Sequence, residues 1–527
     1  MSDKVTIKRA LISVSDKKDL VAFAKKLEAQ GVEIISTGGT FKALDQAGVK
    51  VIAIDQVTQF PEMMDGRVKT LHPRIHGGLL GLRDNPAHLE AMAKHGIEPI
   101  DLVCVNLYPF EQTIARKDVS ESQAIEQIDI GGPSMLRSAS KNFQSVVVVT
   151  DPEQYDLVAS QIEEYNGATK LNLRRKLALA AFAKTAAYDT AIATWMANSG
   201  EEGFSDPLLL KMKLANELRY GENPHQNGAL YVDPKSHEAS VAKAKQLHGK
   251  ELSFNNLYDA NGALELVKEV CVSQAAAAAV IKHANPCGFA ISQTLVDAFE
   301  RAYQGDPLAA FGGIVAMNRT VDLATAEKIV EGQKFLEVIV APGFEDQALE
   351  LIRGRWKNVR ILAVGDLGRP EDRDLQEREF KKITGGILVQ DRDLKNILPE
   401  EWEHAAGPKP DDQTIEQMRV AMVAVKHLKS NAVCLVNDHA LVGAGAGQMD
   451  RVASCQLAIQ KAGQRANGAI VGSDAFFPFR DGPDLLIAAG VKAIAQPGGS
   501  KRDEETITAC QEAGVTLMLT HTRHFRH

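Results

Sequence analysis

The sequence has few cysteines and no long apolar run. Its 527 residues contain six cysteines, and no two of them are spaced as a Cys-x-x-Cys pair. Scattered thiols in a chain of this length are typical of a reducing compartment, not of a disulfide framework. No apolar stretch approaches the roughly 18 residues of a membrane helix, and the start MSDKVTIKRALISVSD lacks the apolar core of a signal peptide. We therefore expect a cytoplasmic protein that does not enter a membrane.

The sequence also lacks any long block of one charge sign. Lys and Arg total 60 and Asp and Glu total 68, which gives a net charge of -8. Such a balance argues against a nucleic-acid-binding surface or a basic membrane-binding arm. It is compatible with small phosphorylated ligands, because these need only a few cations and backbone N–H groups.

The first 150 residues alternate apolar strands with amphipathic helices. Ser15 or Asp16 is placed to cap the first helix, and Gly31 to end it. The expected strands are 9–15, 32–37, 49–54, 100–108 and 145–151. This order predicts an α/β domain over residues 1–150 with a doubly wound parallel sheet.

A helical connector is expected over residues 151–200, because 170–198 is rich in Ala, Leu, Lys and Arg. The stretch SGEEGFSDP (199–207) is typical of a domain boundary. A second domain is expected to follow, over 201–527.

The second half contains a faint internal echo. AVIKHANPCGFAI (279–291) and VAVKHLKSNAVCLV (423–436) each join an apolar run to Lys-His and then to Asn and Cys. This pattern favours two related α/β units, over about 201–365 and 366–527. The charged segment 345–412 shows no functional pattern.

The segment STGGT (36–40) lies between an expected strand and an expected helix. Glycines allow a ligand to approach the backbone closely, and a helix N-terminus offers unpaired N–H groups. The segment therefore predicts a phosphate site, although an ordinary glycine turn gives the same pattern. It lacks the Gly-Lys-Ser/Thr ending of an ATP-binding loop.

Two further motifs of the first domain carry charge. In GRVKTLHP (66–73), Arg67 and Lys69 would share one side of an extended chain and suit a phosphate or a developing oxyanion. A solvated basic loop is the alternative interpretation.

NLYPF (106–110) places Asn106 and Tyr108 on one face at the end of a strand, where open α/β sheets bind ligands. Further on, Asp129 precedes a Gly-Gly turn and a Pro-started helix that carries Arg137 and Lys141 four residues apart. A carboxylate, a phenol and several cations can therefore meet in one cleft, although each of them alone is more often structural.

The motif KHANPCG (282–288) follows an apolar strand, and LRYGENPHQ (218–226) joins a cation, a phenol, an amide and an imidazole in a Gly/Pro-rich loop. Histidine is the side-chain type that exchanges a proton most readily near neutrality, so we expect His283, next to Lys282, to suit removal of a proton from an attacking amine. A zinc deaminase would need His-x-Glu and Pro-Cys-x-x-Cys, and neither is present.

Two other patterns resemble cofactor or metal motifs and are rejected as such. GAGAGQ (443–448) has Gln448 where a dinucleotide fingerprint has its third glycine, so it predicts a tight turn near a ligand and not NAD binding. HTRHFRH (521–527) is more typical of a polar chain end than of a metal cluster.

Taken in order, SVSDK, STGGT, GRVKTLHP, NLYPF, QIDIGG, RYGENPHQ, KHANPCG, AAFGG, GAGQ and DAFFPFRD resemble the bifunctional enzymes that join phosphoribosylaminoimidazolecarboxamide formyltransferase to IMP cyclohydrolase. The resemblance spans nearly the whole chain. It implies a methylglyoxal-synthase-like N-terminal domain with the cyclohydrolase, and two cytidine-deaminase-like units without zinc that carry the formyltransferase. It also implies a homodimer with the transferase sites at the subunit interface.

For the cyclohydrolase, the resemblance implies that Lys69 and Tyr108 stabilise an oxyanion and that Asp129 and Lys141 transfer protons. The implied substrate-binding residues are Ser15, Lys17, Thr37, Gly38, Gly39, Thr40, Arg67, Thr70, Asn106 and Ile130.

For the transferase, the resemblance implies that His283 acts as the base and that Lys282 stabilises charge during attack on 10-formyltetrahydrofolate. The implied binding residues are Arg219, Tyr220, Asn255, Phe311, Gly312, Glu337, Asn431, Arg451, Phe476, Asp481, Ser500, Arg523 and Phe525.

The expected ligands are thus a purine-precursor ribonucleotide and a folate, with no catalytic metal and with a monovalent cation left open. A nucleotide-sensing protein without turnover is the alternative from another class. The combination of Lys69, Tyr108 and Asp129 with the His283 motif disfavours it.

Overall fold

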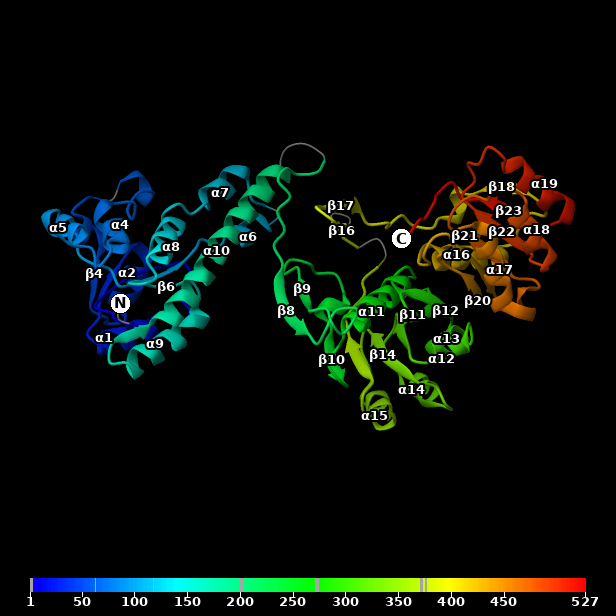
Figure 1. Cartoon of the computed structure of the whole chain (residues 1–527), viewed down its shortest axis with the longest axis horizontal. Helices are drawn as coiled ribbons and strands as arrows, with labels where there is room; N and C mark the ends of the chain where they lie inside the picture. Colours follow the sequence, from blue (N-terminus) through cyan, green and yellow to red (C-terminus); the bar gives the residue numbers. More distant parts are fainter. Residues whose placement is uncertain are drawn as a thin grey trace. The chain divides into compact units, whose positions relative to one another are not determined.

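The computed structural model describes residues 3–61, 63–116, 118–198, 203–270, 274–369, 373–374 and 377–527. The chain divides into two compact units, Met1–Lys211 and Met212–His527 (Figure 1). Residues 199–202 of the predicted boundary and Cys271 lie outside the described residues. The five cysteines that are described carry free thiols. Among the described helices, none is both long and apolar enough to cross a membrane.

The first unit is built on a five-stranded sheet in the order β4-β3-β2-β5-β6, with every neighbouring pair parallel. The prediction of an α/β domain with a parallel sheet is confirmed. The strands are β2 (Arg9–Val14), β3 (Glu33–Ser36), β4 (Val51–Ala53), β5 (Leu102–Asn106) and β6 (Val147–Val149), and β1 (Lys4–Thr6) pairs separately with β7 (Ala168–Lys170). The helices are α1 (Leu20–Ala29), α2 (Gly38–Gln46), α3 (Ile54–Thr58), α4 (Pro73–Leu80), α5 (Pro86–Lys94), α6 (Phe110–Ile114), α7 (Glu121–Glu126), α8 (Gly131–Lys141), α9 (Tyr155–Glu164) and α10 (Leu171–Asn198).

Three local predictions for this unit were wrong. Asp19 and not Ser15 or Asp16 stands at the start of α1. The glycines of STGGT form the first turn of α2 and not a separate turn. Likewise α8 begins at Gly131, so its Gly-Gly pair lies inside the helix. In the last two cases the glycines were taken for turn residues, although a helix also tolerates them in its first turn.

Helix α10 belongs to the core of the first unit. Leu173, Leu177, Ala181 and Tyr188 are buried in the same apolar cluster as the sheet. The segment expected to connect two domains is therefore also one wall of the first unit.

The second unit is built on a mixed sheet of twelve strands, in the order β10-β15-β14-β13-β11-β12-β20-β19-β21-β22-β23-β18. Its first half contains β10 (Lys245–His248), β11 (Ala276–Lys282), β12 (Asn285–Ser292), β13 (Gly313–Met317), β14 (Leu336–Ala341) and β15 (Arg360–Ala363). Its second half contains β18 (Glu403–Ala406), β19 (Val433–Asn437), β20 (Ala440–Gly445), β21 (Ile470–Ser473), β22 (Ala493–Gln496) and β23 (Thr516–Leu519).

Helices cover this sheet, and two short ribbons stand apart from it. The helices are α11 (Phe254–Val267), α12 (Leu295–Tyr303), α13 (Pro307–Ala310), α14 (Leu323–Val330), α15 (Asp346–Arg355), α16 (Asp412–Lys426), α17 (Arg451–Ala462), α18 (Asp481–Ala488) and α19 (Asp503–Ala513). The ribbons are β8 (Lys213–Leu218) with β9 (Gly228–Val232), and β16 (Arg378–Ile383) with β17 (Gly386–Asp391).

The two halves of the large sheet repeat one topology. In each, a hairpin (β11–β12, β19–β20) pairs antiparallel with a third strand, two parallel strands follow, and an antiparallel strand closes the edge. Even the bulges correspond, since both hairpins shift register inside the ladder. The halves meet at β12 and β20, where Ala290 pairs with Ala440.

The Lys-His echo in the sequence does not align with this repeat. Lys282 ends strand β11, whereas Lys426 ends helix α16. The two dipeptides therefore occupy elements that do not correspond. The repeat is visible in the order and direction of the strands and not in the Lys-His pattern of the sequence.

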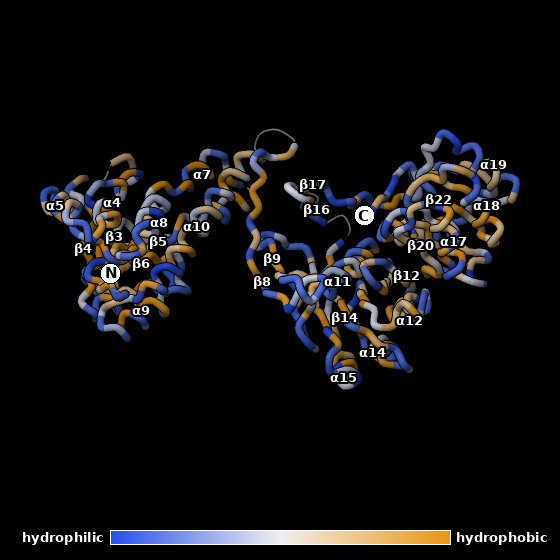
Figure 2. The backbone as a smooth tube through the Cα atoms, in the orientation of Figure 1, coloured by the Kyte–Doolittle hydropathy of each residue, from blue (hydrophilic) through white to orange (hydrophobic). Residues whose placement is uncertain are grey.

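The segment 208–214 is strongly apolar and exposed. It reads LLLKMKL, and the part between α10 and β8 is largely orange in Figure 2. Leu210 and Met212 expose 52% and 51% of their surface. Such a stretch on a surface usually marks a contact with another molecule.

Candidate active sites

A cavity of about 570 Å³ opens in the first unit where β2, β3 and β5 end. Strand β2 lies between β3 and β5, so the chain leaves the sheet in two directions there, and open α/β sheets bind ligands at such a point. Twelve of the residues predicted from the sequence line the cavity: Ser15, Lys17, Thr37, Gly39, Thr40, Arg67, Lys69, Thr70, Asn106, Tyr108, Asp129 and Ile130.

The STGGT segment is fixed by its hydroxyl groups. The Thr40 hydroxyl accepts from Val14 N–H and donates to Val14 C=O, both at 3.0 Å. The hydroxyls of Thr37 and Ser13 hydrogen-bond at 2.7 Å. Both threonine hydroxyls are bonded within the protein, and Thr40 N–H donates to Thr37 C=O at 3.0 Å. The groups that this segment can offer to an anion are therefore the N–H groups of the two glycines at the start of α2.

Asn106 joins the ends of β5 and β2. Its side-chain oxygen accepts from the N–H groups of Ser15 and Asp16, at 2.6 and 2.9 Å, and from the Ser15 hydroxyl at 2.8 Å. The motifs SVSDK and NLYPF are therefore neighbours in space. Their role at this point is to hold the rim of the cavity.

Arg67 and Lys69 reach the cavity from a turn and not from an extended strand. A short 3-10 helix over Met64–Gly66 precedes them, and residues 67–70 continue as turns. Arg67 forms an ion pair with Glu126, and both side chains are largely exposed. Lys69 also lines a second cavity of about 580 Å³, together with Gly38. The spacing argument was wrong, although both cations line the predicted site.

Asp129 is held at the start of α8 by close backbone contacts. Its carboxylate accepts from Gly132 N–H at 2.8 Å. A Cβ atom added at Gly132 would lie 2.4 Å from the Asp129 carboxylate, and one added at Gly131 would lie 2.4 Å from the Thr70 hydroxyl. A side chain at either position would force Asp129 or Thr70 to shift, which favours the Gly-Gly pair.

Burial tunes two groups of this cavity toward proton chemistry. It raises the pKa of the Asp129 carboxyl, against the opposing effects of the Gly132 and Tyr108 N–H groups and of Lys69. Burial also raises the pKa of the Tyr108 phenol, helped by the charges of Asp129 and Glu126. The carboxylate is thus more basic than usual, and the phenol keeps its proton and can donate it in a hydrogen bond.

Lys141 does not line this cavity. It is the last residue of α8, whose first residue, Gly131, does line it. Ten residues of α-helix separate their backbones by about 15 Å. The role of Lys141 in proton transfer therefore stays a prediction of the resemblance, without support from the geometry.

In the second unit, most of the predicted residues lie where strands of the twelve-stranded sheet begin or end on one side of it. Strand β11 ends on this side, and the antiparallel β13 begins there. The pairs β11–β12, β12–β20, β20–β19 and β19–β21 are all antiparallel, so β21 runs in the same direction as β11 and ends on the same side of the sheet. Strands β22 and β23 are parallel to β21 and also end there. Most of the predicted transferase residues stand near these strand ends, whereas Arg219 and Tyr220 follow β8 of the separate ribbon and Asn255 lies in α11.

Lys282 is anchored where β11 ends. Its ammonium group donates to the backbone oxygens of Gly312 and Phe311, at 3.0 and 3.3 Å. An ammonium group has three donors, so one of them can still meet a ligand. The rings of Phe311 and Phe335 pack 5.5 Å apart beside it.

His283 lies in the tight turn between β11 and β12. His283 and Ala284 both have positive φ, 52° and 60°, which suits a two-residue hairpin turn. The carboxylate of Asp259 accepts from Ala284 N–H at 2.8 Å and so holds the turn from α11. The Asn-Pro-Cys-Gly part of the motif is not a turn but begins strand β12. Asp259 was missed, because no local pattern connects it with His283.

A cationic cavity of about 520 Å³ lies in the first half of the second unit. It brings together the predicted residues Arg219, Tyr220 and Glu337, and Phe335 also lines it. Asn255 lies next to the lining residue Asn256 and donates to Glu222 C=O at 3.3 Å. Glu337 forms an ion pair with Arg360 at 2.6 Å. The further cationic residues of the lining, which the sequence did not single out, are Lys250, Arg355, Lys357 and Arg360.

Arg451 is buried and bound within the protein. Its guanidinium group forms an ion pair with Asp474 at 2.6 Å and donates to the side-chain oxygen of Asn431 at 2.8 Å. Asp474 is fully buried and also accepts from Ser430. Arg451 therefore positions the Asn431 segment, and it offers little surface to a ligand directly.

The remaining predicted residues follow the parallel strands of the second half. Phe476 and Asp481 come after β21, Ser500 after β22, and Arg523 and Phe525 after β23. The C-terminal tail is not a loose polar end. His524 contacts Asp393 at 2.7 Å, and Ser430 bonds to the Arg526 backbone. The guanidinium group of Arg523 lies 4.5 Å from the Phe525 ring centre.

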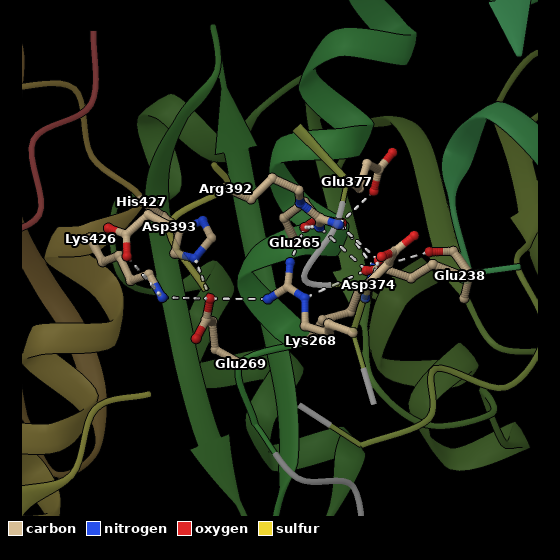
Figure 3. A network of polar contacts seen from close by, with 12 residues as sticks. Glu238, Glu265, Lys268, Glu269, Asp374, Glu377, Arg392, Asp393, Lys426 and His427 are labelled. Atoms are coloured by element: carbon tan, nitrogen blue, oxygen red, sulfur yellow. Dashed lines mark hydrogen bonds and ion pairs between the residues drawn. The ribbon is translucent and has the colours of Figure 1, made fainter. Parts of the chain in front are cut away.

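Segment 345–412, in which the sequence shows no functional pattern, takes part in a buried network of ion pairs (Figure 3). Arg392 bonds to Glu238 and Glu265, each at 2.8 Å, and Lys426 bonds to Glu269 at 3.1 Å. Burial would raise the pKa of Glu238, but the bonds to Arg392 and Lys268 hold it at about 2. The network fastens the flanks of the β16–β17 ribbon to α11 and to the end of α16.

The first unit is an α/β domain with a polar cavity where its parallel strands end, and residues 19–134 match the family model of an MGS-like domain. Residues 139–461 match the model of the AICARFT/IMPCHase bienzyme. The chain is 49% identical to the bifunctional purine biosynthesis protein PurH of Oceanobacillus iheyensis, over 99% of this chain and 100% of that protein. It is 50% identical to the PurH of Magnetococcus marinus, over 99% of each chain.

The chain therefore belongs to the AICARFT/IMPCHase bienzyme family. It is a bifunctional enzyme, an AICAR formyltransferase and IMP cyclohydrolase of the final steps of de novo purine synthesis. The functional prediction from the sequence is confirmed.

Proposed function

We propose that ring closure takes place in the cavity of the first unit and formyl transfer at the sheet edge around Lys282 and His283. In this assignment residues 1–150 carry the cyclohydrolase, 151–200 form the helical connector and 201–527 carry the transferase. The observation that supports it best is that Lys69, Tyr108 and Asp129 line one cavity, with a basic carboxylate beside a protonated phenol.

In ring closure, the carboxamide nitrogen of the formylated substrate attacks its own formyl carbon. Asp129 accepts the proton that the nitrogen loses as the C–N bond forms, and the formyl oxygen becomes an oxyanion. Lys69 and Tyr108 stabilise that charge by donating to it. The proton held by Asp129 is then returned to that oxygen, the formamide nitrogen gives up its own proton to the same oxygen as the ring C=N bond forms, and the C–O bond breaks so that the oxygen leaves as water. The reaction is intramolecular, so orientation supplies much of the acceleration.

In formyl transfer, the amine of the aminoimidazole attacks the formyl carbon of the co-substrate, which we propose is 10-formyltetrahydrofolate. His283 accepts the amine proton, and Lys282 stabilises the tetrahedral oxyanion. The C–N bond to the folate then breaks, and the folate nitrogen takes up a proton. The cationic cavity around Arg219 suits the phosphate of the ribonucleotide.

We also propose that the enzyme works as a homodimer. Segment 208–214 is apolar and exposed, and β8 is exposed along most of its length in a ribbon of two strands. A two-stranded ribbon alone is only marginally stable in water. A second copy of the chain can cover both surfaces.

The two sets of transferase residues also favour a site shared between copies. Strands β12, β20 and β19 lie between β11 and β21 in the sheet. Four interstrand spacings therefore separate the ends of β11 and β21, next to Lys282 and Phe476, by about 19 Å. A partner could bring its second-half residues to the first-half residues of this chain. The repeated topology of the halves supports two cytidine-deaminase-like units.

The two-site assignment is tested by assaying two variants in two reactions. His283→Ala should abolish formyl transfer, followed as tetrahydrofolate release, and leave cyclisation of the preformed formyl intermediate intact. Lys69→Ala should lower cyclisation by about 100- to 1000-fold and leave formyl transfer intact. Loss of both activities in either variant, with the fold retained by circular dichroism, would contradict the assignment.

A further inference from the structure

Helix α10 carries a buried tyrosine whose hydroxyl group holds the Asp129 loop. The Tyr188 hydroxyl donates to Gln127 C=O at 2.9 Å and accepts from Asp129 N–H at 2.8 Å. One phenol thus ties two backbone groups on either side of Ile128. Tyr188 is 8% exposed and does not line the cavity, so it touches the site only through this loop.

The ring of Tyr188 also supports the segment that carries Tyr108. It packs edge-on against Phe110, with ring centres 6.2 Å apart, and Trp195 of the same helix packs on Phe110 at 5.6 Å. Phe110 in turn donates its N–H to Tyr108 C=O at 2.8 Å. Helix α10 therefore contacts the chain next to both groups that are tuned for proton chemistry.

Burial keeps the Tyr188 hydroxyl in its neutral form. It raises the pKa of this phenol to about 12, so the donor to Gln127 is present throughout the physiological range. A neutral hydroxyl can donate and accept at the same time, which a phenolate could not do.

We propose that Tyr188 is a positioning residue of the cyclohydrolase reaction. It fixes the Asp129 backbone, so that the carboxylate meets the attacking nitrogen of the substrate. The proposal rests on the role assigned above to Asp129. Under this proposal α10, which the sequence predicts to be a connector, also contributes to the reaction of the first unit.

The test compares Tyr188→Phe with Tyr155→Phe in cyclisation of the preformed formyl intermediate. Both tyrosines are buried in the first unit, but the Tyr155 hydroxyl accepts from the Cys104 thiol at 3.6 Å, and Tyr155 does not line the cavity. Tyr188→Phe should lower kcat by about 10- to 100-fold with KM changed less than twofold. Tyr155→Phe should leave both within twofold, and neither variant should alter formyl transfer.

The pH dependence of kcat for cyclisation distinguishes a specific effect on the Asp129 loop from a general destabilisation of the first unit. Asp129 has a pKa raised by burial, and a loosened loop admits water, so its pKa falls. In Tyr188→Phe the acid limb of kcat should therefore move to lower pH, and in Tyr155→Phe it should not. A Tyr188→Phe enzyme with unchanged kcat and an unchanged acid limb would overturn the proposal, as would equal losses in the two variants.

Asp129→Asn distinguishes the two ways of failing. If it keeps full cyclisation, the role of Asp129 is wrong and the inference about Tyr188 falls with it. If it loses cyclisation while Tyr188→Phe does not, only the positioning role of Tyr188 is refuted.

Discussion

Asp259 offers a sharp test of how the transferase site is held together. His283 and Ala284 adopt left-handed backbone conformations, with φ of 52° and 60°. Such a conformation costs about 1–2 kcal/mol for each non-glycine residue. The Asp259 carboxylate offsets part of this cost by accepting from Ala284 N–H at 2.8 Å. We expect Asp259→Ala to release the turn and to misplace His283.

The size of the effect follows from that bond. A hydrogen bond to a charged group contributes about 1.5–3 kcal/mol, and the lower value applies because Asp259 is only partly buried. A loss of about 1.5 kcal/mol corresponds to roughly a tenfold fall in kcat for formyl transfer. Glycine pays no such cost at positive φ, so adding Ala284→Gly should restore about 1–2 kcal/mol and most of the rate.

The assay is tetrahydrofolate release, with cyclisation of the formyl intermediate measured in parallel. Asp322→Ala is the matched control, because the Asp322 carboxylate also accepts a backbone N–H at 2.8 Å, from Thr325, and it does so at the start of α14. The control should keep its formyl transfer rate, and no variant should lose cyclisation. An Asp259→Ala enzyme within twofold of the unmodified rate would refute the reasoning, and so would a double variant that is no faster than Asp259→Ala.

Three further outcomes are expected. Arg174 is fully buried and donates to backbone oxygens of Phe143 and Gln144 at 3.0 and 3.1 Å, so Arg174→Met should lower the free energy of unfolding by about 3 kcal/mol in urea titrations. The exposed neighbour Arg175→Met should change it little. The pKa of Glu238 is held at about 2, below its ordinary 4.5, so its contribution to stability is present above about pH 4.5 and is lost as the pH falls toward 2; urea midpoints measured across this range should show the loss, and Glu238→Gln should flatten it. Gly132→Ala places a Cβ atom 2.4 Å from the Asp129 carboxylate and should lower the cyclisation rate by about 10- to 100-fold. Gly262→Ala is the control, because the added atom meets nothing within 4 Å, and it should keep the cyclisation rate. Equal cyclisation rates in the two variants would contradict the close contact at Gly132.

The sequence by itself determined the parallel sheet of the first unit and most of its cavity. Short apolar runs such as 9–15 and 100–108 are typical of buried strands. The polar groups that follow Val14 and Asn106 then lie together where these parallel strands end. Local chemistry sufficed for Ser15, Thr40 and Asn106, because they stand at or just after the ends of β2, β3 and β5. Even so, the turns were misplaced wherever glycines open a helix, since glycine suits both structures.

Only the tertiary structure decided the rest. The repeat in the second unit lies in strand order and not in residue pattern, so the Lys-His echo pointed to elements that do not correspond. Asp259, Asp474 and Tyr188 hold His283, Arg451 and Asp129 from 24, 23 and 59 residues away along the chain. A hydrogen bond at that separation follows from how helices pack on a sheet, and a single sequence carries no local signal of it.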